Sequence, residues 1–110
     1  MLSRVYSAGL YGIDGYEITV ECSAWNRVPR FEIVGLPDLA IKEAKERVRA
    51  ACENSGFPFP SLDLVVNLAP ANRKKEGSAF DLAILVAILQ CDGRIDRRLS
   101  LSDKCFIGEL

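Results

Sequence analysis

Histidine is absent from this sequence, and its absence excludes several kinds of site. The 110 residues contain no histidine and four cysteines, and the cysteines form no Cys-x-x-Cys pair. Catalysis by Ser-His-Asp or Cys-His groups needs an imidazole base, and a structural zinc site needs clustered Cys or His ligands. We therefore expect no metal site and no catalytic site of these types. The cysteines stand in or beside apolar stretches and are expected to be buried free thiols: Cys22, Cys52, Cys91 and Cys105.

A membrane segment, a nucleotide-binding loop and an excess of charge of one sign are missing as well. The longest apolar run is the eight residues 82–89, whereas a helix that crosses a bilayer needs about 20. Neither of the two common glycine-rich phosphate-binding motifs occurs, so no nucleotide site is expected. The net charge is −1, and any contact with nucleic acid would therefore have to be local. Without a signal peptide at the N-terminus, we expect a cytoplasmic protein that binds no membrane.

Alternation of apolar and polar residues predicts three strands early in the chain. The segments 3–12 and 16–25 are separated by a glycine-containing turn and are expected to form a hairpin, and 30–35 is the third strand. A length of 110 residues with 49% hydrophobic content is sufficient for one core. We expect a single domain over residues 1–110.

Two helices of different character follow these strands. The segment 38–54 has one apolar stripe and many charges, and Asp38 is its predicted N-cap. The segment 79–89 is apolar except for Asp81 and is expected to be buried. Ser78 and Asp81 have the spacing of a capping box at the start of this second helix.

The order of the elements predicts the fold class. A central strand over 62–68 separates the two helices, and a last strand is expected to begin at Lys104. Connections of these lengths favour a mixed sheet with its helices on one face. The predicted class is therefore α+β in two layers.

The basic triplet Arg73, Lys74 and Lys75 is the best local site for an anion. It lies just before the apolar helix, where three positive charges would add to the free N–H groups and the positive dipole end. One hypothesis is a weak contact with DNA through this triplet, aided by Arg47 and Arg49, with no sequence preference. The alternative is that the triplet and the charged helix face are simply solvated.

Several motifs in this sequence resemble one known family. Taken together, they are similar to the N-terminal domain of the magnesium chelatase-like AAA+ ATPases, the family of the competence protein ComM and the YifB proteins. The resemblance covers essentially the whole chain. Its most specific parts are VGLP at 34–37, the block 42–49, NLAP at 67–70, KEG at 75–77 and FDL at 80–82.

The resemblance implies a fold like ribosomal protein S5 domain 2, which the Lon protease catalytic domain shares. In Lon-type proteases a Gly-Pro-Ser-Ala-Gly motif carries the nucleophile, and aligning Gly77 with its first glycine puts Ala79 at the nucleophile position. Ser78 falls one residue early, so this resemblance does not support proteolysis. The chain is expected to continue into an ATPase module that binds ATP and Mg²⁺, because the sequence resembles only the first part of such proteins.

Three functions remain open at this point. The first is a non-catalytic accessory domain of a hexameric AAA+ ATPase, which helps to assemble the ring or to guide DNA during recombination. The second is a Lon-like serine peptidase with Ser78 as a displaced nucleophile. The third is a module that only mediates oligomerisation.

Overall fold

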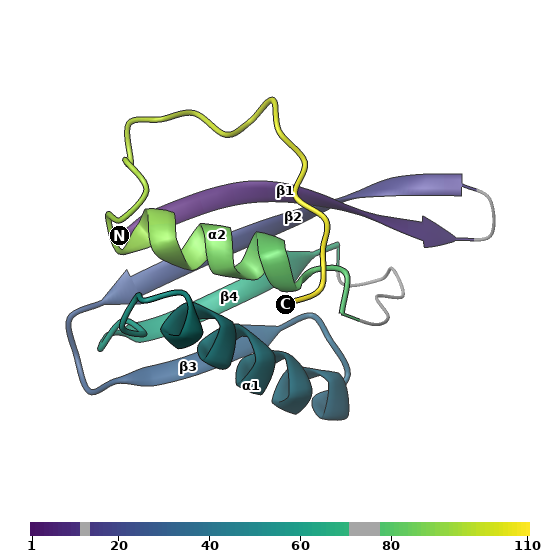
Figure 1. Ribbon diagram of the computed structural model, residues 1–110. Helices are drawn as coiled ribbons and strands as arrows, with labels where there is room; N and C mark the ends of the chain where they lie inside the picture. The colour runs from purple at the N-terminus through teal and green to yellow at the C-terminus, as the bar shows by residue number, and fades with distance from the viewer. Residues whose placement is uncertain (12–13, 71–77) are drawn as a thin grey trace.

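A long N-terminal hairpin forms one half of the sheet, and a β-α-β unit contributes the other half (Figure 1). The computed structural model describes residues 1–11, 14–70 and 78–110. Its elements in chain order are β1 (Leu2–Tyr11), β2 (Asp14–Trp25), β3 (Arg30–Val34), α1 (Asp38–Asn54), β4 (Asp63–Ala69) and α2 (Asp81–Cys91).

The sheet is mixed, as the sequence predicts. Its strand order is β1-β2-β4-β3. β2 pairs antiparallel with both β1 and β4, whereas β3 pairs parallel with β4 because α1 carries the chain back between them. β4 is therefore a central strand, which agrees with the nearly continuous apolar run in its sequence.

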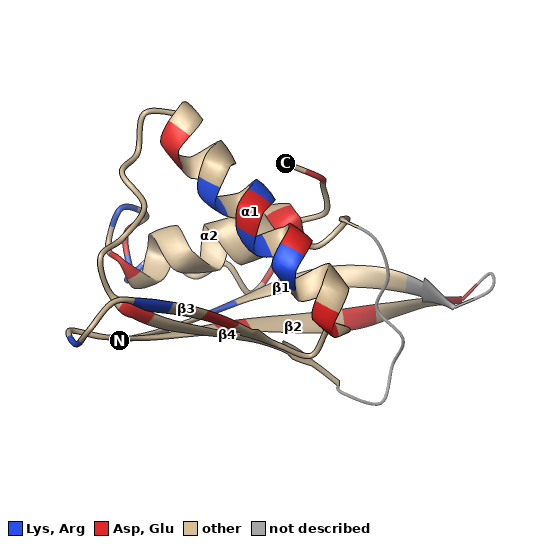
Figure 2. Cartoon of the chain, turned by 90° about the horizontal axis from the view of Figure 1, so that it is seen from below, with Lys and Arg blue, Asp and Glu red and all other residues tan. Residues whose placement is uncertain are grey.

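Both helices cover the same face of this sheet (Figure 2). Alternate residues of β2, among them Ile18, Val20 and Cys22, are fully buried beneath the helices. The predicted α+β architecture in two layers is thus confirmed. None of the helices in the described ranges is long and apolar enough to cross a membrane.

The helix α2 is buried almost throughout, as its sequence predicts, but the predicted caps of both helices are wrong. Asp38 is the first residue of α1 rather than its N-cap, and neither helix has a side-chain hydrogen bond at its N-terminus. Ser78 and Asp81 form no capping box, since α2 begins at Asp81 itself. The physical reason is that both side chains are engaged elsewhere, Ser78 with Glu109 and Asp81 with Arg47.

The end of the chain also differs from the prediction. Residues 104–110 contain no assigned strand. The N–H of Phe106 donates to the carbonyl of Tyr6 at 2.8 Å, and the segment then leaves the sheet for the start of α2. Cys105 is exposed in this segment, so the expectation of a buried thiol is wrong for it, whereas the other three cysteines are buried.

Gly35 brings the ends of β3 and β4 into close contact. Its φ is +108°, a backbone conformation that glycine adopts without a steric penalty, and a Cβ atom at this position would collide with the carbonyl oxygen of Leu68. A side chain at this position would collide with main-chain atoms that cannot rotate away.

We expect Gly35→Ala to destabilise the domain by more than about 3 kcal/mol. Gly56→Ala is the matched control, because Gly56 has a φ of +89° and nothing within 4 Å of an added Cβ. Both variants carry the strain of alanine at positive φ, about 1 kcal/mol, but only the first adds a collision. Urea unfolding measures both losses, and equal losses would show that the backbone relaxes around the new methyl group.

Candidate functional site

A partly buried ion pair lies where α1 crosses the start of α2. Asp81 is 1% exposed, and its two carboxylate oxygens accept hydrogen bonds from Arg47 Nε at 2.7 Å and Nη2 at 3.1 Å. This two-point geometry is the strong form of an arginine–carboxylate contact. The hydrogen bond to Asp81 is also the main reason why the pKa of Arg47 is raised above its ordinary value. The pair fixes α1 against α2.

The same carboxylate helps to hold the C-terminal segment. The backbone N–H of Leu110 donates to Asp81 Oδ2 at 3.3 Å, and Ser78 Oγ donates to Glu109 Oε1 at 2.6 Å. Two backbone hydrogen bonds reinforce these contacts, since Gly108 donates to Ala79 at 2.9 Å and Leu82 donates to Gly108 at 3.0 Å. We call this arrangement the clasp, and its members are Arg47, Ser78, Asp81, Gly108, Glu109 and Leu110.

The clasp binds parts of the chain to one another. Its hydroxyl, its carboxylates and its guanidinium satisfy each other at hydrogen-bonding distance. Ala79, which the Lon resemblance aligns with the nucleophile, offers only a methyl side chain and uses its carbonyl to hold Gly108. Such an arrangement is suited to fastening the C-terminal segment at a defined place and direction.

The predicted DNA-contact residues have different positions in the structure. Arg73, Lys74 and Lys75 lie outside the described residues. Arg47 belongs to the clasp, and Arg49 lies over the ring of Phe59 with its guanidinium carbon 4.6 Å from the ring centroid. The contact of these residues with DNA stays a prediction.

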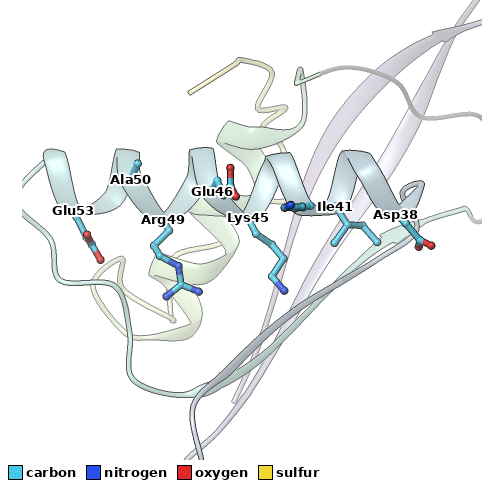
Figure 3. Close-up of a pocket in the computed structure, with 8 residues that line it drawn as sticks. Asp38, Ile41, Lys45, Glu46, Arg49, Ala50 and Glu53 are labelled. Atoms are coloured by element: carbon cyan, nitrogen blue, oxygen red, sulfur yellow. The ribbon is translucent and has the colours of Figure 1, made fainter.

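The helix α1 carries a groove of about 500 Å³, lined by Asp38, Ile41, Lys42, Lys45, Glu46, Arg49, Ala50 and Glu53. Figure 3 shows that Lys45 and Arg49 point from α1 toward the strands. Three cationic and three anionic side chains line this groove, so its net charge is close to zero. Within residues 1–11, 14–70 and 78–110, no cluster of His, Cys, Asp and Glu could hold a metal ion.

Sequence reasoning missed the partnership of Arg47 and Asp81. The available signal was that Asp81 is the single charged residue in an otherwise apolar helix, because a buried carboxylate needs a cation. The cation itself lies 34 positions away on another helix, and helical spacing alone could not select it from the many charges of α1.

Comparison with known proteins identifies the family. A family model described as subunit ChlI of Mg-chelatase matches residues 20–110, and the chain therefore belongs to this magnesium chelatase-like family. It is 42% identical to the competence protein ComM of Haemophilus influenzae over 109 residues, which are 99% of this chain and 21% of that protein. Over the same share of both chains it is 43% identical to YifB of Salmonella typhimurium and 38% identical to YifB of Escherichia coli.

These matches confirm the resemblance seen in the sequence motifs. The matched part is the N-terminal part of the ComM and YifB proteins. The chain spans about a fifth of the length of these relatives.

We expect Arg47→Ala to reduce the free energy of unfolding by about 2–3 kcal/mol, because it leaves the Asp81 carboxylate buried without its cation. Arg98→Ala is the matched control. The ion pair of Arg98 with Asp96 is exposed, so the free energy of unfolding of this variant should change little. Urea titrations of the two variants measure the difference.

A double variant tests whether charge burial is the cause. We expect the double variant Arg47→Met with Asp81→Leu to recover much of the free energy of unfolding that Arg47→Ala loses, because no buried charge remains. If Arg47→Ala unfolds at the same urea concentration as Arg98→Ala, the pair does not stabilise the junction of the two helices.

Proposed function

We propose that this chain is a non-catalytic N-terminal accessory domain of a magnesium chelatase-like AAA+ ATPase. The observation that carries the proposal is the match of nearly the whole chain to the N-terminal fifth of ComM and YifB. In this proposal the ATP and Mg²⁺ sites belong to a module of the parent protein beyond these residues. The parent protein assembles into a hexameric ring, and this domain helps to assemble the ring or guides DNA through it.

The finer fold assignment is part of the same proposal. A mixed sheet with both helices on one face is consistent with a domain like ribosomal protein S5 domain 2. In such a domain the start of α2 corresponds to the catalytic region of Lon. The clasp occupies this region here, and its side chains are used to fasten residues 108–110. We infer that a site for peptide cleavage has been replaced by an attachment point for the chain.

Two observations support DNA as a partner. The Haemophilus influenzae relative is named a competence protein, and the sequence places Arg73, Lys74 and Lys75 just before α2. Because only about three phosphates would be neutralised by this triplet, the contact is weak and depends strongly on salt.

We expect this chain alone to hydrolyse neither ATP nor peptides. It lacks a phosphate-binding loop, and Ala79 cannot act as a nucleophile. Phosphate release with MgATP and cleavage of an unstructured protein such as casein measure the two activities. Casein cleavage that Ser78→Ala abolishes would instead establish the serine peptidase. ATP hydrolysis by the purified chain would contradict the assignment of the nucleotide site to another part of the protein.

We expect the triple variant Arg73→Ala, Lys74→Ala and Lys75→Ala to lose binding to a fluorescein-labelled DNA duplex at low salt. For the unsubstituted chain, the logarithm of affinity should fall against the logarithm of salt concentration with a slope of about −2.7, since three counterions are released. A second duplex of scrambled sequence should bind equally. Fluorescence anisotropy measures all of these quantities.

The control for this experiment removes the same charge elsewhere. Lys42, Arg98 and Lys104 are exposed, and replacing them with alanine should change DNA binding much less. Equal losses in the two triple variants would indicate that only net charge matters. If neither the unsubstituted chain nor the variants bind DNA, and sedimentation shows self-association, the oligomerisation module is the better description.

A further inference from the structure

Two buried cysteines lie close together between the sheet and α2. Cys22 on β2 and Cys91 at the end of α2 are both 0% exposed. Cys91 Sγ lies 3.5 Å from the carbonyl oxygen of Cys22 and donates to it. The carboxyl end of α2, which carries Cys91, lies beside the N-terminus of the chain (Figure 1).

A third residue fixes the position of this pair. Ser3 on β1 lies directly opposite Cys22 in the antiparallel ladder, and its hydroxyl donates to the carbonyl of Ala87 at 2.5 Å. In an α-helix the carbonyl of residue 87 is also the acceptor for the N–H of residue 91. Ser3 therefore anchors the last turn of α2 on the strand pair that carries Cys22, and this holds Cys91 above Cys22.

The pKa values of the two thiols are shifted in opposite directions. The Cys22 side chain lowers the pKa of Cys91, and the positive N-terminus and Arg97 act in the same direction, against the opposing effect of burial. The Cys91 side chain, together with burial, raises the pKa of Cys22. Because the thiolate is the nucleophile in disulfide exchange, Cys91 is the attacking group and Cys22 the resolving group.

We propose that Cys22 and Cys91 form an intramolecular disulfide when the protein meets a small disulfide such as oxidised glutathione. This inference goes beyond the proposed function and does not depend on it. The last turn of a helix opens more easily than its middle, so a small reagent can reach Cys91 in a brief local opening. The resulting bond would join the carboxyl end of α2 to β2.

The reaction balances in two exchange steps. The Cys91 thiolate attacks one sulfur of the reagent, the reagent's S–S bond breaks, and one small thiolate leaves and takes up a proton. Cys22 then attacks Cys91 Sγ, the bond from Cys91 to the reagent breaks, and the departing second small thiolate takes up the proton that Cys22 loses. The protein loses two hydrogens and is oxidised, while one small disulfide is reduced to two thiols.

The other two cysteines have different surroundings and serve as controls. Cys52 is buried at the end of α1, where its Sγ donates to the carbonyl of Phe57 at 3.3 Å. Cys105 is exposed in the C-terminal segment. The double variant Cys52→Ser and Cys105→Ser keeps the Cys22–Cys91 pair as its only thiols, and serine can still donate to Phe57.

The test compares oxidation of this double variant in the folded and unfolded states. The folded chain is treated with oxidised glutathione, quenched with acid, unfolded, alkylated with N-ethylmaleimide and weighed by mass spectrometry. We expect a product about 2 Da lighter than the reduced chain, with no alkyl group, and a proteolytic peptide pair that joins Cys22 to Cys91. In guanidinium, where the thiols are no longer held together, glutathione adducts should accumulate instead.

Hydrogen exchange gives an independent readout. The amides of residues 88–91 should exchange at least about tenfold more slowly after oxidation, because the new bond prevents the end of α2 from opening. Two alkyl groups or two glutathione adducts on the folded chain would overturn the proposal. Formation of the disulfide at the same rate in guanidinium would also overturn it, since the fold would then contribute nothing.

Discussion

The buried carboxylate of Asp81 is the constraint on which the rest of the structure depends. A carboxylate that is 1% exposed would cost several kcal/mol if it had no partner. Arg47 supplies the charge, and because Arg47 is in the middle of α1, the pair fixes where that helix crosses α2. The remaining hydrogen-bonding capacity of Asp81 is used by Leu110. One charge therefore sets the relative positions of two helices and the C-terminal segment.

The apolar character of α2 explains why the sheet, α1 and the C-terminal segment are all needed to cover it. The helix has no polar side, so water must be excluded from its whole circumference. The sheet covers one side through residues such as Val20 and Val66, and α1 covers another through Val48. The C-terminal segment covers the first turn, where Gly108 lies next to Leu82. The clasp adds polar contacts to this packing. The first turn of a helix leaves backbone N–H groups without a partner inside the helix, and the N–H of Leu82 donates to Gly108 in the clasp.

Much of the fold could be predicted from the sequence, because strand alternation and the apolar run of α2 are local signals. The boundaries of β3 and α1 came within a residue of the prediction, and the mixed sheet followed from the order of elements. The predicted capping box was wrong because the spacing of Ser78 and Asp81 indicates only which hydrogen bonds are possible between residues close in sequence. The actual partners of these side chains, Glu109 and Arg47, are distant in sequence. The Arg47–Asp81 pair was beyond prediction for the same reason. The basic triplet at 73–75 lies outside the described residues, so that part of the candidate site stays a prediction.

The hydrogen bond from Phe106 to Tyr6 joins the segment 104–110 to β1, and this affects how the domain folds during its synthesis. A ribosome releases the hairpin of β1 and β2 first, and these strands can pair as soon as both have emerged. Asp81 emerges later, when Arg47 has already been released, and Glu109 and Leu110 follow Asp81 only 28 and 29 positions further along the chain. During synthesis α2 therefore passes through a stage in which its first turn is uncovered, and only the end of translation of this segment completes its protection.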